Sequence, residues 1–319
     1  MKQSWRLHAA GALAAGCCAL AAFGCRRSSE APMREKGRGL PAATARGYRI
    51  ELGERALELD ALDGGRIVEF SLAGRSVVLP SSESARAYGS SFWPSPQREW
   101  KWPPPPELDA KPWQASSDGR AIVARSDENA TYRLSASQRI EALPTELGFS
   151  IEYRIRNHGD APRKVAGWQN TRVRPRGLTF FPASVPAYTQ SAFALAPLDG
   201  VMWFAHAGSD DARHGKLFAD GEEGWLAHVD GGLLFVKVFP DVRPEQQAPG
   251  EADVEIYVDP KGQFVEVEQQ GPYEDVAPGS EVRWQCRWGV ERLDALGPVR
   301  SGDAALVTHA RALAERIRR

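Results

Sequence analysis

Cysteine is scarce in this chain. There are only four cysteines in 319 residues, and Cys17, Cys18 and Cys25 lie close together near the N-terminus. The rest of the chain contains only Cys286 and therefore cannot form an internal disulfide. Cys286 stands in a run where apolar residues alternate with polar ones, so we expect a buried, unreactive thiol.

The chain also lacks an excess of charge of one sign. It has 40 basic and 41 acidic residues, a formal net charge of −1. Because nucleic-acid binding usually needs a basic face, this balance argues against a nucleic-acid partner. The phosphate-binding and dinucleotide-binding glycine motifs are missing, as is the G-x-S-x-G turn of hydrolases. Paired cysteines and an H-E-x-x-H helix are missing too, so we predict no metal and no cofactor.

The uncharged apolar run from Ala9 to Phe23 is shorter than the roughly 20 residues that a membrane-spanning helix needs. It follows a short basic start and is typical of a secretory signal. The run ends in Ala22-Phe23-Gly24-Cys25, which resembles a bacterial lipobox. This resemblance implies a signal peptide over residues 1–24 and a lipid anchor on Cys25. The protein would then be an exported envelope lipoprotein, periplasm-facing or in the outer membrane. The alternatives are processing at Cys17, which leaves a very short apolar core, a plain signal peptide, and an uncleaved N-terminal anchor.

The pattern changes after residue 46. Residues 25–46 are rich in Arg, Ser, Gly and Pro without a period, which predicts a flexible tether. From Gly47 onward, short alternating segments are separated by turn residues. The clearest is Phe149 to Arg156, whose period of two predicts a half-buried antiparallel strand. Similar segments follow at Leu233–Phe239, Val254–Val258, Phe264–Gln269 and Val282–Val290.

Many strands without intervening helices predict an all-β fold of stacked antiparallel sheets over residues 47–298. The lack of a repeat of fixed period argues against a propeller. The last segment differs, because Leu306, Ala310, Leu313 and Ile317 fall on one helical face. We therefore predict a short C-terminal helix within residues 299–319 that caps the sandwich or lies on its surface.

The segment from Gly89 to Trp113 contains four tryptophans and seven prolines. Such a composition does not suit a regular strand or helix. Proline stiffens a loop, so the aromatic rings and Arg98 would be held in place at little entropic cost on binding. Packing in the core is the alternative for most of the chain's ten tryptophans.

The C-terminal half carries a more specific pattern, FVEVEQQGPYEDVAPGSEVRWQCRW from Phe264 to Trp288. Glu268 stands two residues before Gln270, and a Pro278-Gly279 turn and a last strand follow. This order resembles the galactose mutarotase-like superfamily, which includes the aldose 1-epimerases. The segment from Ile50 to Leu79, which contains Gly64-Gly65-Arg66-Ile67, is similar to the family's first strands, and Tyr153 to Arg172 is similar to its middle strand pair. The segments FWPSPQ, FFP and EQQGPYEDVAPG together are similar to a bacterial branch known as DUF4380.

The resemblance implies an antiparallel supersandwich with a concave sugar-binding face. In the epimerases a Glu acts as base on the anomeric hydroxyl while a His protonates the ring oxygen. Glu268 is the candidate base. The segment at the family's His position, Gly167 to Arg172, contains no His. His158 lies in the preceding turn, and His206 and His228 do not match the family position.

Three functions therefore stay open. The first is a carbohydrate-binding protein, and the second is an aldose 1-epimerase-like enzyme with Glu268 as base and an Arg, Lys or unplaced His as acid. The third is a non-catalytic interaction protein of the cell envelope. Arg is a poor proton donor because its pKa exceeds about 12. Under the first hypothesis the partners are a sugar or polysaccharide and, through the lipid anchor, a membrane. The predicted sugar contacts combine stacking tryptophans with polar groups, and they are Trp93, Arg98, Trp100, Trp102, Gln169, Asn170, Arg172, Glu268 and Gln270.

Overall fold

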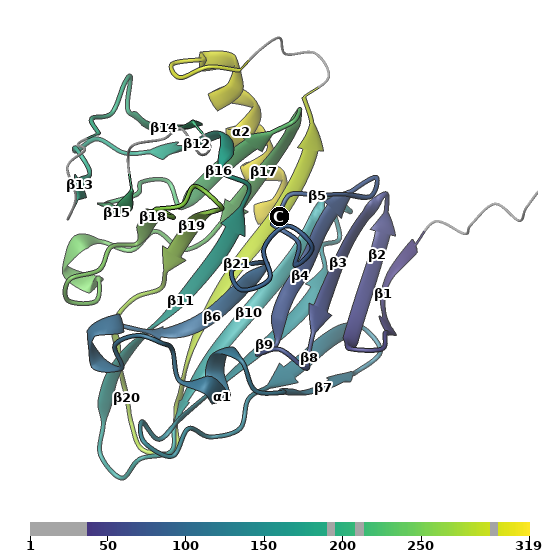
Figure 1. The fold of residues 1–319 in the computed structure, drawn as a ribbon, viewed down its shortest axis with the longest axis vertical. Coiled ribbons are helices and arrows are strands. Elements are labelled where there is room, and N and C mark those ends of the chain that lie inside the picture. The colour runs from purple at the N-terminus through teal and green to yellow at the C-terminus, as the bar shows by residue number, and fades with distance from the viewer. Residues whose placement is uncertain (1–36, 190–194, 208–213, 294–298) are drawn as a thin grey trace, which may run out of the picture. The chain divides into compact units, whose positions relative to one another are not determined.

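Two antiparallel sheets form the body of the fold, as the computed structural model shows (Figure 1). The structure describes residues 37–189, 195–207, 214–293 and 299–319. Within these ranges every strand pairing is antiparallel, so the all-β prediction is confirmed. The predicted signal peptide and Cys25 lie outside the described residues.

The first sheet has 12 strands. Their order is β1 (Gly37–Ala43), β2 (Gly47–Gly53), β3 (Arg55–Asp60), β4 (Arg66–Leu72), β6 (Ser90–Ser95), β11 (Arg163–Val173), β19 (Val265–Gln270), β18 (Val254–Val258), β15 (Gly215–Ala219) and β13 (Tyr188–Thr189), with β5 (Arg75–Ser76) beside β4 and β20 (Glu274–Val276) beside β11.

The second sheet has nine strands and is followed in the chain by the main helix. The strand order is β14 (Val201–Ala207), β12 (Arg176–Pro182), β16 (Trp225–Asp230), β17 (Leu233–Val238), β21 (Glu281–Arg292), β10 (Gly148–Asn157), β9 (Leu134–Ala142), β8 (Ala121–Arg125) and β7 (Gln114–Ser117). The helices are α1 (Pro106–Asp109) and α2 (Ala304–Arg318), with short 3-10 turns at Gln97–Glu99 and Pro244–Gln246. None of the helices in the described ranges is long and apolar enough to cross a membrane.

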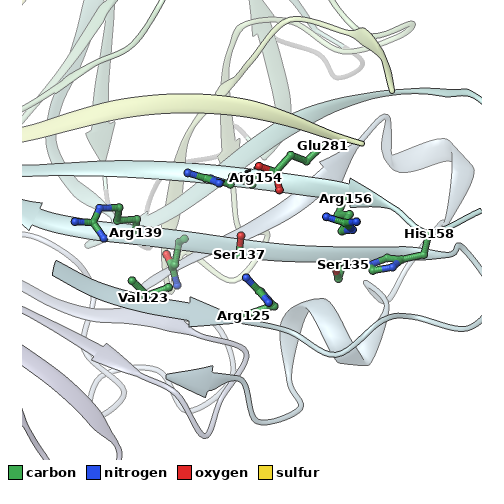
Figure 2. A pocket seen from close by; sticks show the side chains of 10 residues that line it. Val123, Arg125, Ser135, Ser137, Arg139, Arg154, Arg156, His158 and Glu281 are labelled. Carbon is green, nitrogen blue, oxygen red and sulfur yellow. Dashed lines mark hydrogen bonds and ion pairs between the residues drawn. The ribbon is translucent and has the colours of Figure 1, made fainter. Parts of the chain in front are cut away.

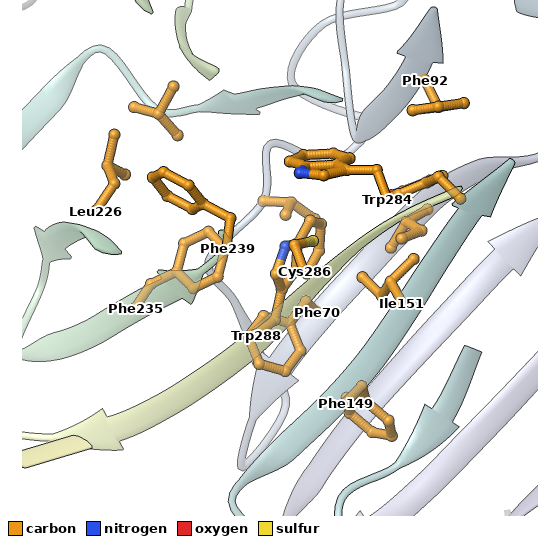
Figure 3. Packing of buried hydrophobic residues seen from close by; sticks show 14 of the residues in the cluster. Phe70, Phe92, Phe149, Ile151, Leu226, Phe235, Phe239, Trp284, Cys286 and Trp288 are labelled. Carbon is orange, nitrogen blue, oxygen red and sulfur yellow. The ribbon is translucent and has the colours of Figure 1, made fainter. Parts of the chain in front are cut away.

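The core lies between the inner faces of the two sheets (Figure 3). Strand alternation places one apolar set of each strand there, as predicted for β10. Aromatic rings meet across the sandwich: the ring centroids of Phe70 and Trp288 are 5.6 Å apart, and those of Phe92 and Tyr153 are 4.2 Å apart. Cys286 is a free, buried thiol in this layer, and burial raises its pKa to about 12. The expected burial of this thiol is confirmed, and its lack of reactivity stays a prediction.

A second core lies on the outer face of the second sheet, beneath α2. Leu306, Leu313 and Ile317 are fully buried there and pack against β17 and β21. The helix begins after Asp303, whose side chain accepts hydrogen bonds from two backbone N–H groups of the first turn. The prediction of a short C-terminal helix lying on the sandwich is therefore confirmed.

The tether predicted over residues 25–46 is wrong for its last part, because residues 37–43 form strand β1. This strand pairs with β2 along the edge of the first sheet, with a register shift between Arg38 and Pro41. An edge strand is held by backbone hydrogen bonds and tolerates Pro, so its side chains need no alternation. The sequence therefore gave no periodic signal for it.

One buried cation crosses the core. Lys237 projects from β17 of the second sheet, and its Nζ donates to Thr171 Oγ1 at 2.7 Å and to the Val267 carbonyl at 3.1 Å in the first sheet. Among the described residues it forms no ion pair, and its ammonium lies 5.3 Å from the centre of the Trp288 ring. Burial lowers the pKa of Lys237 to about 7.

The lowered pKa predicts a specific pH dependence of stability. Between pH 7 and about 10.5 the unfolded chain binds a proton at Lys237 that the folded chain has released. The free energy of unfolding should therefore rise with pH in this window, by up to roughly 1.4 kcal/mol per pH unit from this group. Lys237→Met should be more stable than the parent at pH 6, and its advantage should shrink toward pH 10.

Urea unfolding of both proteins across this range measures the difference. The exposed Lys261→Met is the matched control and should leave the pH profile unchanged. An advantage of Lys237→Met that does not vary with pH would contradict the lowered pKa.

Candidate functional site

A pocket of about 680 Å³ lies on the first sheet, opposite its core face. We call it the Glu268 pocket. Aromatic residues and ionisable residues share its lining. The aromatic residues are Trp93, Trp102, Trp168, Tyr257 and Phe264; the ionisable ones are Arg66, Arg86, Asp109, Arg172, Lys216, Glu266 and Glu268, with the amide of Asn170 beside them.

The pleat of β11 decides which side chains reach this pocket. Trp168, Asn170 and Arg172 stand two residues apart and line it together. Asn170 is paired in register with Glu268 on β19, and Arg172 with Glu266. Glu268 is in turn paired with Glu255 on β18. The three neighbouring strands β11, β19 and β18 therefore bring polar side chains to one patch of the pocket floor.

Glu268 has no exposed surface, and its two carboxylate oxygens differ in their contacts. Oε2 accepts a hydrogen bond from the Trp168 indole Nε1 at 2.6 Å and lies 3.0 Å from Lys216 Nζ. Oε1 makes no hydrogen bond within the described part of the chain. A buried carboxylate oxygen without a partner is costly, so this atom is a natural contact for a ligand hydroxyl.

The ammonium of Lys216 links two buried carboxyl groups. It lies 2.5 Å from Glu255 and 3.0 Å from Glu268, which face one another across β18 and β19. It also lies 4.2 Å from the centre of the Trp168 ring. This cluster fixes the direction in which the Glu268 carboxyl points.

The same cluster sets the protonation of the site. Burial raises the pKa of Glu268 to about 7, Lys216 opposes this shift and Glu255 adds to it. Burial also raises the pKa of the Glu255 carboxyl. For Lys216, burial disfavours the charged form, but the two carboxylates hold its pKa above the usual value. Near neutral pH, Glu268 can therefore accept or donate a proton, whereas Lys216 remains a cation.

Arg172 is held rigidly at the edge of the floor. Its Nε lies 2.9 Å from Glu266 Oε1, and its Nη1 donates to Ser91 Oγ at 2.8 Å. The guanidinium also lies over the Trp93 ring, 5.2 Å from its centre. Burial raises the pKa of Glu266, and Arg172 opposes this shift. An arginine fixed in this way presents its remaining N–H groups in a defined direction.

The segment rich in Trp and Pro forms one wall of the pocket. The prediction that this segment contains no regular strand is wrong for its first part, because Ser90–Ser95 form strand β6, which pairs with β11. The Trp93 indole donates to Asp109 Oδ1 of α1 at 2.9 Å, and Arg66 Nη2 lies 3.4 Å from the same oxygen. Trp102 is 68% exposed at the rim and meets Trp93 edge to face at 6.1 Å. The loop and Glu268 therefore share one pocket.

The family model described as "Domain of unknown function (DUF4380)" matches residues 91–291, more than half of the chain. The chain belongs to the DUF4380 family. The sequence matches no curated protein at a significant level.

Solved structures resemble the DUF4380 chain in fold. A galactose mutarotase-like protein from Clostridium acetobutylicum superposes with a TM-score of 0.54 at 11% identity, covering 77% of this chain and 95% of that one. A galactose mutarotase-like protein from Lactobacillus casei gives 0.54 at 10% identity, covering 79% and 100%. A galactose mutarotase related enzyme from Lactobacillus acidophilus gives 0.53 at 10% identity, covering 79% and 99%. The fold is therefore the mutarotase-like supersandwich that the sequence motifs predicted.

Five of the sugar contacts predicted from sequence line the Glu268 pocket: Trp93, Trp102, Asn170, Arg172 and Glu268. Their roles toward a ligand stay predictions. The remaining four predicted contacts, Trp100, Arg98, Gln169 and Gln270, lie elsewhere.

Trp100 is buried behind Trp93 and Trp168, and its indole donates to the Pro94 carbonyl. Arg98 is exposed on the 3-10 turn and does not line the pocket. One of the predicted stacking platforms, Trp100, is therefore turned inward. Neither side chain is retained as a ligand contact.

Gln169 points into the core, because it follows Trp168 on a pleated strand. Its amide donates to the Tyr153 hydroxyl and accepts from the Trp288 indole at 3.1 Å. Gln270 stands two residues after Glu268 on β19 and does not line the pocket; it hydrogen bonds to Ser95 Oγ and Glu255 Oε1. These two glutamines support the site without reaching the pocket.

None of the histidines in the described ranges lines the Glu268 pocket. His206 and His228 stand on β14 and β16 of the second sheet, where Thr179 Oγ1 lies 2.8 Å and 3.0 Å from their ring nitrogens. Burial lowers the pKa of His228 to about 4. His158 follows β10 and contacts Ser135. The described residues also contain no group of three or more His, Cys, Asp or Glu that could hold a metal ion.

Sequence reasoning missed Lys216, Glu255, Asp109 and Trp168. Trp168 shares the two-residue period of Asn170 and Arg172, so the alternation was sufficient to find it. Lys216 lies on the five-residue strand β15, and only the pairing of β15 with β18 brings it to Glu268. No local pattern marks such a residue.

The electrostatic cluster predicts opposite effects of two substitutions. The carboxyl of Glu268 should titrate near pH 7. Lys216→Met removes the neighbouring cation and should raise this midpoint further, whereas Glu255→Gln removes a competing acid and should lower it. Carbon-13 NMR of glutamate carboxyl groups measures the midpoint, with Glu268→Gln assigning the signal.

Lys111→Met, which removes an exposed lysine paired with Glu107, is the control and should leave the midpoint in place. A Glu268 midpoint near 4.5, the ordinary value of a glutamate, would show that the site is open to water and the cluster absent.

Proposed function

We propose that the Glu268 pocket of this DUF4380 chain binds a carbohydrate. The main observation in support is that Trp93, Trp102 and Trp168 share one pocket with Asn170 and with charged groups. Sugars present apolar C–H faces, which pack on aromatic rings, and hydroxyls, which need dense polar partners. The mutarotase-like fold supports the same proposal, because several structures of this fold are titled as galactose mutarotase-like.

The polar groups suit hydroxyls in particular. Glu268 Oε1 and the amide oxygen Oδ1 of Asn170 are buried acceptors without a hydrogen bond in the described residues. Arg172 adds N–H donors beside them, held by Glu266. A ligand that both donates and accepts on adjacent atoms satisfies this arrangement, and a vicinal diol has that chemistry.

An enzyme of the aldose 1-epimerase type is the second candidate. The observation in its favour is the Glu268 pKa of about 7, which suits a general base. In such a reaction the carboxylate takes the anomeric hydroxyl proton, and the C1–O5 bond opens as the ring oxygen gains a proton. The free aldehyde then closes on its other face. Lys216 is a weak proton donor because two carboxylates hold its charge, so ligand binding without turnover is the proposal we place first.

Titration against a panel of mono- and oligosaccharides tests the binding proposal. Isothermal calorimetry should detect saturable binding to at least one sugar. Trp102→Ala should weaken it by about 5-fold, since an aromatic contact contributes on the order of 1 kcal/mol. Arg98→Ala, which removes an exposed arginine outside the pocket on the same loop, is the matched control and should bind like the parent.

The Glu268→Gln variant separates the two candidates. If binding survives while no anomer interconversion is detectable in the parent by proton NMR, the protein is a binder. If the parent interconverts anomers and Glu268→Gln does not, it is an enzyme. Absence of binding across the whole panel would leave the third hypothesis, an envelope interaction protein whose aromatic residues serve packing alone.

We also propose that the protein is exported and held at a membrane by a lipid on Cys25, where the ligand would be an envelope or extracellular sugar or polysaccharide. The support is the apolar run that ends in Ala22-Phe23-Gly24-Cys25. Cys25→Ser should abolish labelling by a fatty-acid analogue and move the protein from the membrane fraction to the soluble fraction. Cys17→Ser is the matched control, and a reversed result would assign the anchor to Cys17.

A further inference from the structure

A second pocket, of about 310 Å³, lies on the outer face of the second sheet (Figure 2). We call it the outer-face pocket. It is formed by β8, β9, β10 and β21 on the half of that face that α2 leaves uncovered, because α2 packs over β17 and β21. No residue lines both this pocket and the Glu268 pocket. The two sites are therefore independent.

Strand register assembles the outer-face pocket. Arg125 on β8 is paired with Ser137 on β9, and Ser137 with Arg154 on β10. Two residues along the same face, Ser135 is paired with Arg156. Figure 2 shows the two serines of β9 with Arg125 on one side and Arg154 and Arg156 on the other. Guanidinium and hydroxyl groups thus alternate across three strands.

The charges in this pocket are only partly compensated. Four arginines line it against one carboxylate, Glu281. Arg154 lies 2.9 Å from Glu281 and 2.5 Å from Glu152, and Glu281 also holds Arg283 at 3.0 Å. Arg139, the fourth arginine, pairs with Asp118 and Glu141. These carboxylates are therefore already engaged.

Arg125 and Arg156 differ from the other two. Both are exposed, and neither side chain forms a hydrogen bond or an ion pair with any described residue. The Ser137 hydroxyl is also without a partner in the described ranges, whereas Ser135 Oγ lies 2.8 Å from His158 Nε2. Outward positions of neighbouring strands commonly carry paired charges of opposite sign. Here two unpaired guanidinium groups flank the hydroxyls of Ser135 and Ser137. This arrangement places several hydrogen-bond donors in the outer-face pocket.

From this geometry we infer that the outer-face pocket binds a phosphate or sulfate group. Arginine presents a planar fork of donors that matches such oxyanions, and the serine hydroxyls add further donors. A tetrahedral oxyanion has enough acceptor atoms for both unpaired arginines and Ser137 at once. The pocket volume exceeds that of the bare ion, so the group fits as an ester of a small molecule. Ser137 and Ser135 would contact the oxyanion, and Arg125 and Arg156 would neutralise it.

Titration of the intact protein with inorganic phosphate, inorganic sulfate and glycerol 3-phosphate at constant ionic strength tests this inference. NMR shifts of arginine side chains should show saturable binding with millimolar or lower Kd. Arg125→Ala and Arg156→Ala should each weaken binding at least 10-fold. Arg292→Ala removes an exposed, unpaired arginine on β21 outside the pocket and should leave the Kd unchanged. Ser137→Ala tests the hydroxyl separately and should weaken binding by a smaller factor without altering surface charge.

Several results would overturn the inference. One is non-saturable shifts, and another is equal weakening by Arg292→Ala, since both indicate diffuse surface electrostatics. Binding to vesicles of anionic phospholipid without any binding of glycerol 3-phosphate would also overturn the inference, because it would indicate a charged surface without a specific pocket. Binding of soluble phosphate esters that vesicles do not compete for supports a free ligand, whereas competition by vesicles supports a lipid headgroup as the source. Circular dichroism of each variant verifies that the sheet is intact, and sugar binding at the Glu268 pocket should be the same in all of them.

Discussion

The pleat of strand β11 is the constraint on which the first sheet and its pocket both depend. One set of its residues, including Gln169 and Thr171, faces the core and bonds with Tyr153 and Lys237 of the second sheet. The intervening residues face the Glu268 pocket. A shift of one residue in register would exchange the two sets. Arg172 would then face the core, and Gln169 would face the Glu268 pocket. The polar contacts of the core therefore also fix the geometry of the pocket floor.

Burial of charge is the second organising effect. Glu255, Lys216 and Glu268 have little or no access to water, and removing charges from water is costly unless they compensate one another. The ammonium between two carboxyl groups supplies part of this compensation, and the Trp168 indole supplies more. The cost of burial that stays uncompensated raises the pKa of the Glu268 carboxyl to about 7. The proposed function uses this carboxyl as a hydrogen-bond partner for the ligand, whether or not a reaction follows.

The two faces of the sandwich carry different side chains. On the first sheet, the loop from β6 to α1 walls off a pocket with aromatic rings above a charged floor. On the second sheet, α2 covers one half of the outer face and leaves the strands β8 to β10 bare. The bare half carries Arg and Ser where a covered half carries Leu and Val. The same fold thus offers one site suited to apolar and hydroxyl groups and another suited to anions.

The sequence alone determined the class of the fold, because alternation with a period of two and a helical period near the C-terminus are local properties. It also determined which strand carries Glu268 and that Asn170 and Arg172 belong with it, through the order of motifs along the chain. It did not determine the edge strand β1, whose pairing uses backbone groups alone. Nor did it separate Gln169 from Asn170, although the pleat does so directly. Lys216 on β15 and Asp109 on α1 come to the site from elements distant from Glu268 in the chain. Only tertiary structure decided their place, and with it the protonation of Glu268, because burial and the distance between charges are properties of the folded chain and not of any local segment.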